Sequence, residues 1–513
     1  MSNVHRPGVA GPATAHVRGA GFAAGIPFFL VLLAATGIVT DIQGVALLPL
    51  VGTMASDLGL SASQTGWALN ALSLASAVVL GLSARYADIV GHRRVLVPLM
   101  TLGVVGSVVC ALASSFELLV VGRVLTGVAI SAPMAWAMLK IRADARVMQT
   151  AALMNGTVIS IMTPIALILG GLMLEAGTSW TAVFWIIAAG YLVLLGLALA
   201  APETPADKRS KVRLDWLGAA GLGAWLICLL LAISNGQEWG WGSTAVVALF
   251  AAGVLVLLLW IVQQRRTEDA LLDFRDMDRR QVFSGYLSYC GIAALASGMY
   301  LIVPAIAQTP SDVGYGFGSS VLGSSMTLLP ILPGTFLASA ISRHLLPRVG
   351  PRPPMILGGA LCVVAYLWYA LAHAHLWQLY VGTALYGVGI VICFNVGWAL
   401  VAAAGRQDNM SITFGIQYAL ALPVGALTTA IMIVVMNADH IAGTAVPVEG
   451  GFTVDFYILA GIAVVTLLAN GLFAVPRALT HHGERDVSGP ATDALEGLEG
   501  AGSVSLPLGA RQR

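Results

Sequence analysis

The chain has 513 residues, of which 58% are hydrophobic and only 10% are charged, and its formal net charge is +1. Soluble domains carry about 25% charged residues, so this composition excludes an ordinary soluble enzyme, and the apolar content also excludes a disordered chain. No basic stripe is available for phosphate groups, which excludes nucleic acid as a partner. The remaining class is a polytopic, all-α membrane protein.

Fourteen apolar stretches have the length of about 20 residues that a helix needs to cross the hydrocarbon core. Only helices are expected, because lipid offers no partner to a free backbone N–H or C=O group. The first stretch is long enough to be an uncleaved first helix. In chain order the predicted spans are residues 26–50, 66–86, 95–115, 118–139, 150–173, 182–201, 215–235, 244–263, 283–307, 320–341, 355–373, 377–403, 411–436 and 453–475.

Two charged stretches, residues 202–214 and 264–282, flank the seventh and eighth spans, so the spans are grouped as six, two and six. Both ends of the chain are polar and are expected to be disordered. The predicted regions are an N-terminal tail (1–25), a six-helix bundle (26–202), an extra helix pair with flanking loops (203–282), a second six-helix bundle (283–475) and a C-terminal tail (476–513).

The basic residues test this count of spans independently. With fourteen spans, every Lys and Arg except Arg123 falls in the tails or in loops on the same side as the tails. The loops on the other side carry acids such as Asp57 and Glu238. Cytoplasmic loops are enriched in Lys and Arg, so we expect a multi-pass protein of the plasma (cell inner) membrane with both termini in the cytoplasm.

An internal repeat relates the two predicted bundles. The loop at 84–94 and the loop at 342–352 each contain a Gly followed two positions later by an Arg. These pairs are Gly91 with Arg93 and Gly350 with Arg352, and both loops follow the second span of their bundle. Duplicated bundles are typical of secondary transporters.

Several motifs occur in an order that is similar to a known family. They are TDIQGVALLP at 40–49, ARYADIVGHRRVLV at 84–97, VVGRVLTG at 120–127, LDWLGA at 214–219 with GQEWGW at 236–241, and QQRRTEDALLDFR at 263–275. Over residues 26–475 the chain resembles the major facilitator superfamily, and within it the fourteen-span drug:proton antiporters of multidrug efflux. The resemblance implies a fold of two six-helix bundles plus a central extra helix pair.

The sequence departs from the family pattern at several positions. Ala84 replaces the first Gly of the loop motif, and His92 stands where an Arg is usual. Thr126 replaces a Gln in the fourth span, while Ala166 and Leu167 occupy the Gly-Pro positions of the antiporter motif in the fifth span. These departures bear on proton antiport and leave the expected fold unchanged.

Asp41 in the first span and Arg123 in the fourth are the sharpest candidates for proton coupling. At 1.5 Å per residue both lie about 9–12 Å below the outer end of their spans. An unpaired charge within a span costs about 2.5–3.5 kcal/mol, so we expect the two side chains to share one cavity. Our hypothesis is that Asp41 carries the proton and Arg123 modulates it, in agreement with the resemblance. The alternative is a static ion pair that sets helix register.

By the same resemblance, Asp88, Arg93 and Arg94 form a cytoplasmic latch, and Gly91 permits the tight turn beside them. Arg93 and Arg94 could equally be topological anchors. The loop of the second bundle, with Gly350 and Arg352, offers no matching acid. In the fifth span the small or helix-bending residues Gly156, Pro164, Gly170 and Gly171 indicate close packing or a hinge.

Polar and aromatic side chains within the spans are candidates for contact with a substrate, although each could instead form an interhelical hydrogen bond. Spans nine to thirteen contain no acid, which favours neutral or singly charged lipophilic substrates. The candidates are Gln43, Asn70, Trp136, Asn155, Tyr386, Asn395, Gln417 and Tyr418.

The chain carries no catalytic constellation, no metal-ligand spacing and no phosphate-binding loop, so we expect neither an enzyme nor a cofactor. The expected partners are the lipid bilayer, a small lipophilic substrate and protons. The sequence leaves the oligomeric state open and is compatible with a monomer. The predicted function is export of small lipophilic compounds, of the drug or antibiotic class, by proton antiport with alternating access. Two alternatives remain: a facilitator-type carrier of a metabolite, lipid or siderophore without proton coupling, and a transport-dead receptor or scaffold.

Overall fold

The computed structural model describes residues 25–203, 215–267, 279–404, 410–436 and most of 438–473. This part of the chain is helical apart from its connections, and its only β-pairing is an isolated bridge between His440 and Pro447. Both tails, for which we expect disorder, lie outside the described residues, as do most of the two charged stretches.

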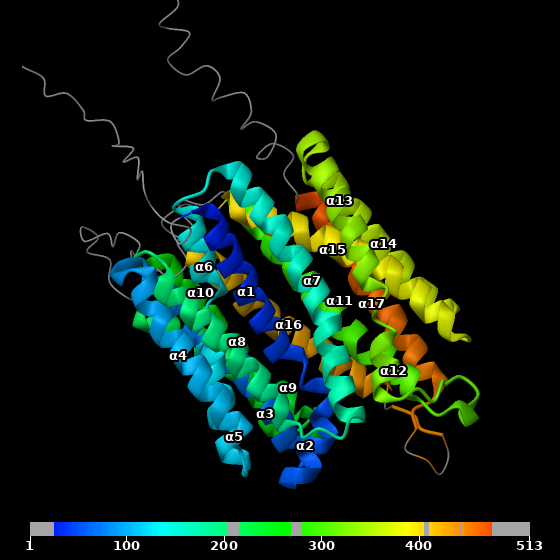
Figure 1. Ribbon diagram of the computed structural model, residues 1–513. Helices are drawn as coiled ribbons and strands as arrows, with labels where there is room; N and C mark the ends of the chain where they lie inside the picture. The colour runs from blue at the N-terminus through cyan, green and yellow to red at the C-terminus, as the bar shows by residue number, and fades with distance from the viewer. Residues whose placement is uncertain are drawn as a thin grey trace, which may run out of the picture.

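The first half of the chain forms one bundle, drawn in blue and cyan in Figure 1. A short 3-10 turn, Leu48–Leu50, joins its first two helices. The helices are α1 (Ile26–Val45), α2 (Val51–Leu58), α3 (Ala62–Val90), α4 (His92–Ala111), α5 (Phe116–Val128), α6 (Ala132–Lys140), α7 (Ala145–Glu175) and α8 (Thr181–Ala200).

The second half forms the extra helix pair and the second bundle. A 3-10 turn, Ser311–Val313, follows the first helix of that bundle. The helices are α9 (Trp216–Trp239) and α10 (Thr244–Arg266), then α11 (Arg279–Gln308), α12 (Val321–Met326), α13 (Ile331–Val349), α14 (Arg352–Leu371), α15 (Leu376–Ala404), α16 (Met410–Met436) and α17 (Glu449–Phe473).

Two predicted spans are broken into two helices each. The span at 118–139 becomes α5 and α6, with Pro133 in the first turn of α6. Proline has no N–H and its ring clashes with the carbonyl four residues earlier, here that of Ala129, which caps α5. Likewise Pro330 precedes α13 and separates it from α12. These prolines explain breaks that hydropathy alone does not reveal.

Twelve helical segments of the described chain are long and apolar enough to cross a membrane. The helices α3 and α16, of 29 and 27 residues, are not among the twelve, although residues 424–436 of α16 form a shorter apolar helix. Each of the fourteen predicted spans therefore corresponds to helix, and the count of fourteen spans is supported approximately.

The two bundles meet along a few helices. Within the first bundle α4 packs against α5 and α8, and α1 packs against α6, α7 and α8. Within the second, α14 packs against α15 and α17, while α11 packs against α15, α16 and α17. Contacts between bundles run from α7 to α12, α13 and α15, and from α16 to α3 and α6 (Figure 1). The interface is therefore built mainly on α7 and α16.

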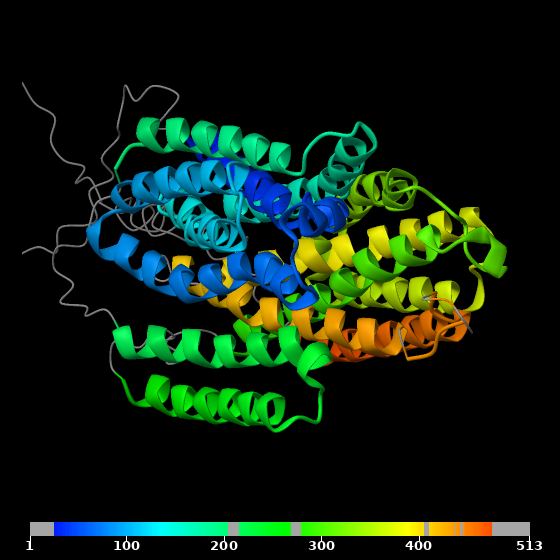
Figure 2. The same ribbon diagram turned by 90° about the horizontal axis from the view of Figure 1, so that it is seen from below.

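The extra pair lies along one edge of the molecule, as Figure 2 shows. Helix α9 packs against α3 and α16, whereas the main contact of α10 is with α9. Asp215 joins the two helices: its carboxylate accepts from the Gly218 N–H at 2.7 Å and from Gln264 Nε2 at 2.7 Å. The pair is thus a hairpin attached to the outside of the bundles.

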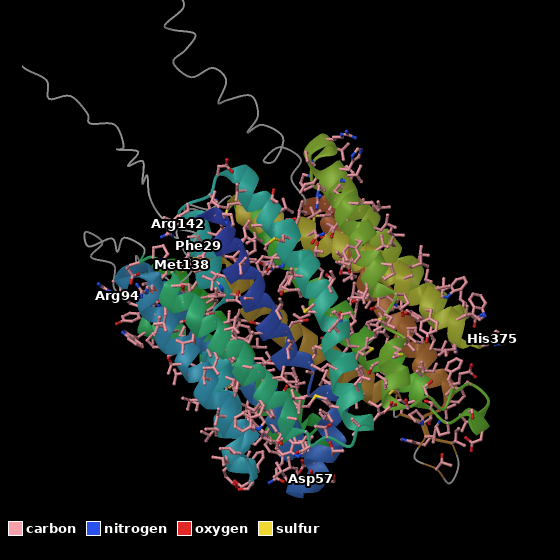
Figure 3. All side chains as sticks on the ribbon, in the orientation of Figure 1. Phe29, Asp57, Arg94, Met138, Arg142 and His375 are labelled. Carbon is pink, nitrogen blue, oxygen red and sulfur yellow. The ribbon has the colours of Figure 1, made fainter. Side chains whose placement is uncertain are left out.

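The two ends of the bundles differ in charge. Figure 3 places Arg94 and Arg142 at one end of the molecule and Asp57 at the other. We call these the basic end and the acidic end. At the basic end the Arg142 guanidinium lies 4.4 Å above the ring of Phe29 and donates to the Met138 carbonyl at 2.9 Å.

The internal repeat corresponds to two equivalent turns. Gly91 follows α3 with φ +113°, and Gly350 follows α13 with φ +77°. In both turns the glycine N–H donates to the carbonyl four residues earlier, and the next helix begins within two residues. Positive φ is readily adopted by glycine alone, which explains why both loops carry a glycine there.

Candidate functional site

Asp41 lies on α1 and is partly buried. The Thr163 hydroxyl on α7 donates to Asp41 Oδ2 at 2.7 Å. Asp41 itself is only partly buried, and Gly44, one turn farther along α1, is exposed. The carboxyl is therefore hydrogen-bonded to a neutral partner, and its residue remains partly exposed.

Three tyrosines of the second bundle lie near this carboxyl. Tyr289 and Tyr300 on α11 and Tyr418 on α16 each lie close enough to interact electrostatically with Asp41. Asp41 thus sits between the bundles, held by the first and faced by hydroxyl groups of the second.

Arg123 is not the partner of Asp41. Its Nε donates to the Ala68 carbonyl at 3.1 Å, its Nη1 to the Gln43 carbonyl at 3.1 Å and its Nη2 to the Leu69 carbonyl at 3.3 Å. No ion pair joins Arg123 to Asp41, both of which the structure describes. The static ion pair, which was the alternative, is therefore absent from the described residues, and Arg123, with 2% of its surface exposed, ties α1 to α3.

Helix geometry explains why Asp41 and Arg123 do not meet. Asp41 and Gln43 are separated by two residues, or about 200° around α1. Asp41 therefore turns toward α7, while the backbone contacted by Arg123 lies on the other side of α1. Two charges can share a depth in the membrane and still occupy different faces of one helix.

Gln43 belongs to the same buried network as Arg123. The Tyr191 hydroxyl on α8 lies 2.8 Å from Gln43 Oε1 and 3.3 Å from the Thr126 carbonyl, and Gln43 Nε2 donates to that carbonyl at 3.5 Å. Only 1% of Gln43 is exposed. The amide of this substrate-contact candidate is thus occupied inside the first bundle. Tyr191 carried no sequence signal, because its contacts depend entirely on tertiary packing.

Five aromatic rings form a cluster between the bundles, which we call the aromatic cluster: Trp136, Tyr289, Phe394, Trp398 and Tyr418. The indoles of Trp136 on α6 and Trp398 on α15 are stacked, with centroids 5.3 Å apart and an interplanar angle of 22°. Tyr289 and Tyr418 each meet Trp398 edge-on, at 5.9 and 5.7 Å. Trp136 and Trp398 are fully buried. The stack therefore joins the two bundles across their interface.

The other substrate-contact candidates differ in their surroundings. Gln417 lies beside Tyr418 on α16, is fully buried, and neither atom of its amide has a hydrogen-bond partner among the described residues. The Tyr386 hydroxyl is likewise buried and has no partner in the described part of the chain. Asn70 is half-buried on α3, and Asn155 is buried on α7 against Gly37 of α1. Gln417 and Tyr386 thus hold unused hydrogen-bonding capacity.

A polar junction connects α7 to the second bundle. The hydroxyls of Thr157 and Ser339 lie 2.6 Å apart, and Asn395 Nδ2 donates to Ser339 at 3.4 Å. A Cβ on Gly156 would lie 2.0 Å from Asn395 Oδ1, so only glycine allows this approach. Asn395 on α15 therefore contacts Ser339 on α13 and Gly156 on α7, and Gly156 has a packing role.

Gly170 and Gly171 also have packing roles. A Cβ on Gly170 would lie 2.3 Å from the Ala46 carbonyl of the first bundle, and one on Gly171 would lie 3.1 Å from Leu322 Cα on α12. Pro164 stands inside α7 without ending it. Helix α7 therefore contacts both bundles closely along its length.

The loop motif at the basic end has a partner within its own bundle. The Arg93 N–H donates to Glu203 Oε1 at 3.2 Å, the Arg94 Nε lies 3.7 Å from Glu203 Oε2, and Arg93 Nη2 donates to the Leu199 carbonyl at 2.7 Å. A Cβ on Gly91 would lie 2.5 Å from Glu203 Oε1. The Asp88 side chain lies outside the described side chains, so a latch to the second bundle stays a prediction.

Two acids near the site, Glu203 and Asp455, could not be recognised as site residues from the sequence. Glu203 stands in the charged stretch after the sixth span, where it reads as one solvated charge among many. Asp455 stands near the predicted start of the last span, but α17 begins at Glu449, so Asp455 lies well inside the helix. The exposed fraction of Asp455 is 0%. The predicted span starts at residue 453, one turn later than α17, so the sequence did not identify Asp455 as a second buried carboxyl.

Comparison with known proteins identifies the family. The sequence model described as the Major Facilitator Superfamily matches residues 28–430. The multidrug resistance protein Stp of Mycobacterium tuberculosis is 25% identical over 424 residues, which cover 81% of this chain and 72% of Stp. A probable actinorhodin transporter of Streptomyces coelicolor is 28% identical, covering 77% of this chain and 71% of the relative.

An uncharacterized MFS-type transporter of Mycobacterium tuberculosis is 28% identical over 350 residues, and the match spans about half of it, 48% of its length. Among solved structures, a proton:xylose symporter, XylE, superposes with a TM-score of 0.62 at 14% identity, covering 89% of this chain and 97% of that one. The human organic anion transporter MFSD10 superposes with a TM-score of 0.60 at 16% identity, covering 87% and 99%. At these identities the structural likeness shows the fold. The chain belongs to the major facilitator superfamily of membrane transporters.

Proposed function

We propose that this transporter exports small lipophilic compounds, of the drug or antibiotic class, in exchange for protons that flow inward. The observation that carries the proposal is the position of Asp41 between the bundles, bound by Thr163 and without a cationic partner among the described residues. Burial disfavours the charged form of a carboxyl, whereas a fixed neighbouring cation would favour it. A carboxyl without such a cation can gain and lose a proton as the bundles move.

Names of relatives agree with this proposal. Besides Stp and the probable actinorhodin transporter, a tetracenomycin C resistance and export protein of Streptomyces glaucescens is 25% identical over 395 residues. These names describe transport of a compound, resistance to compounds, or both resistance and export. Because the identities are low, the substrate of this chain is argued from its own side chains.

The aromatic cluster is the proposed substrate contact and inner gate. Trp136 stands four residues before the end of α6 and Trp398 six before the end of α15, or about 6–9 Å from the basic end. Positive-inside topology puts that end in the cytoplasm. When the indoles separate, a planar aromatic compound can insert between them, and the buried amide of Gln417 can pair with an oxygen of that compound.

Access to Asp41 would then alternate. With the Trp136–Trp398 stack closed, the partly exposed face of α1 leaves Asp41 accessible from the acidic end, where it takes up a proton. With the stack open, substrate enters from the cytoplasm and the proton leaves to that side. The bundles would rock about the contacts of α7 and α16, in keeping with alternating access around a site at the repeat interface.

The test is transport into vesicles with an imposed pH gradient. Purified protein in liposomes should accumulate planar aromatic compounds against their concentration gradient, and dissipating the pH gradient should abolish accumulation. Trp398→Leu should weaken uptake of planar compounds more than uptake of aliphatic ones, while Trp216→Leu serves as the control, because Trp216 is 66% exposed on α9. Equilibration without accumulation would support the uncoupled carrier, and absence of any flux would support the receptor.

A further inference from the structure

A second buried carboxyl lies in the second bundle, on the opposite side of the interface from Asp41. Asp455 is the seventh residue of α17, and 0% of its surface is exposed. Neither Oδ1 nor Oδ2 has a hydrogen-bond partner in the described structure. The proposed proton antiport gives Asp455 no role so far.

The surroundings of Asp455 are apolar. Phe452, Phe456 and Leu459, which lie within one turn of it on α17, are 1%, 0% and 0% exposed. Leu459 packs closely against α11, since a Cβ on Gly298 would lie 2.4 Å from its Cδ2. The face of α17 that carries Asp455 is therefore enclosed by protein, whereas Val454 and Tyr457 lie on an exposed face of the same helix.

No Lys or Arg in the described helices that pack against α17 lies at the depth of Asp455. Helix α17 packs against α11, α14 and α16. The Arg residues of α11 and α14 stand at the first residues of those helices, at the basic end, far from Asp455. The titratable groups within the described parts of these helices and of α17 are otherwise Tyr286, Tyr289, Cys290, Tyr300, Cys362, Tyr366, Tyr369, Tyr418, Glu449 and Tyr457.

One titratable pair lies beyond Asp455 toward the acidic end. His373 Nε2 lies 3.1 Å from Glu449 Oε1 in the first turn of α17. The His373 ring also packs against Phe456, the residue after Asp455, with centroids 6.2 Å apart. Glu449 is half exposed, with 54% of its side chain accessible. This pair marks the side from which water can approach Asp455.

A carboxylate in such a place is expensive. An ionised carboxylate inside a span is strongly disfavoured, and two acceptor oxygens without partners in the described structure add the cost of their desolvation. Protonation removes the charge and turns one oxygen into a donor. Building on the proposed proton antiport, on which this inference rests, we propose that Asp455 is protonated in this structure and is a second proton-binding site of the transport cycle.

The step at this site is a simple protonation. A hydronium ion at the acidic end gives its proton to an Asp455 oxygen, an O–H bond forms, and water is left. Asp455 lies six residues from Glu449, or about 9 Å along the helix, so a modest opening beside α17 admits water to it. The proton returns to water when α17 and α11 rearrange during transport. Each bundle would then carry one proton-binding carboxyl, Asp41 in the first and Asp455 in the second.

The test measures how many protons accompany each substrate molecule. Wild-type protein and Asp455→Asn are placed in liposomes with the membrane potential clamped at zero and a pH gradient of one unit, and the final accumulation of a transported compound is recorded. Each coupled proton contributes about a factor of ten at that gradient. Asp455→Asn should therefore accumulate about tenfold less compound at equilibrium. Asp439→Asn, an exposed acid in the loop before α17, should match the wild type.

Equal accumulation by Asp455→Asn and the wild type would overturn the second site while leaving the proposed antiport intact. Absence of gradient-driven accumulation by the wild type would overturn the antiport itself. Infrared difference spectroscopy covers the case in which Asp455→Asn does not fold. The Asp41→Asn protein should retain a titrating carboxyl C=O band from a buried acid, and loss of every such band in Asp41→Asn would contradict the assignment.

Discussion

The Asp41 carboxyl accepts a hydrogen bond from the Thr163 hydroxyl and does not bind the Arg123 guanidinium. The sequence allowed its depth to be estimated, because helical rise is regular. It did not allow its partner to be identified, because a partner depends on the direction in which a side chain leaves the helix. Thr163 lies 122 positions away along the chain and gave no signal of its own.

Thr163 should therefore influence coupling more than Arg123 does. Thr163→Val keeps the shape of the side chain but removes the donor to Asp41, so we expect a lower rate of gradient-driven transport with unchanged protein stability. Thr163→Ser restores the hydroxyl and should restore the rate. Initial rates in liposomes measure the effect, and Ser160→Ala is the control on the same helix, because the Ser160 hydroxyl donates to the Gly156 carbonyl of α7 itself. Equal rates for Thr163→Val and the wild type would show that this hydrogen bond has no part in coupling.

Arg123 should matter mainly for stability. Its three donors satisfy backbone carbonyls of α1 and α3, and hydrogen bonds from charged groups contribute about 1.5–3 kcal/mol each. Arg123→Gln should lower the unfolding temperature of the purified protein markedly, whereas Arg352→Gln, an exposed change at the start of α14, should not. A stable Arg123→Gln protein with altered pH dependence of transport would favour the original role of Arg123 as a modulator of Asp41.

At the scale of helices, hydropathy predicted where each span lies but not where it bends. The breaks before Ala132 and Ile331 follow from prolines whose backbone effect is local. Close contacts between helices depend on glycines rather than on prolines. Glycines of α7 were recognised in the sequence, yet only the structure assigns Gly156, Gly170 and Gly171 to contacts with particular neighbours.

Gly170 provides a direct test of this packing. In Gly170→Ala the new methyl group would lie 2.3 Å from the Ala46 carbonyl, which must move away. Overpacking of this kind costs about 1–3 kcal/mol, so the unfolding temperature should fall. Gly196→Ala on α8 is the matched control, because nothing lies within 4 Å of the added methyl group. Equal stability of the two variants would contradict the close contact between α7 and the end of the first span.

At the scale of the molecule, the two-bundle plan could be predicted because span count, loop charge and an internal repeat agreed. The contacts across the interface could not. The Trp136–Trp398 stack joins residues 262 positions apart, and the Thr157–Ser339 contact joins residues 182 apart. Such pairs follow from how the bundles dock, which periodicity within one helix does not encode.

A disulfide tests this docking. In a background without the native cysteines, Thr157→Cys combined with Ser339→Cys places two sulfur atoms where the hydroxyls lie 2.6 Å apart. Oxidation should cross-link α7 to α13, which is visible as faster migration on a gel or as resistance to separation after cleavage of the central loop. Thr163→Cys with Ser339→Cys, about 9 Å farther along α7, should remain reduced. Cross-linking of the second pair alone would show a different register between the bundles.

If Asp41 exchanges a proton for substrate, the transporter must release protons when substrate binds. The number of protons released per substrate molecule tests this exchange most directly. Purified transporter in weakly buffered solution is mixed with a compound that the wild type accumulates, and a pH indicator counts the protons released per molecule bound. We expect the wild type to release protons and Asp41→Asn to release one fewer, while its binding still quenches tryptophan fluorescence. Equal release by both proteins, or saturating binding to the wild type without any release, would contradict it.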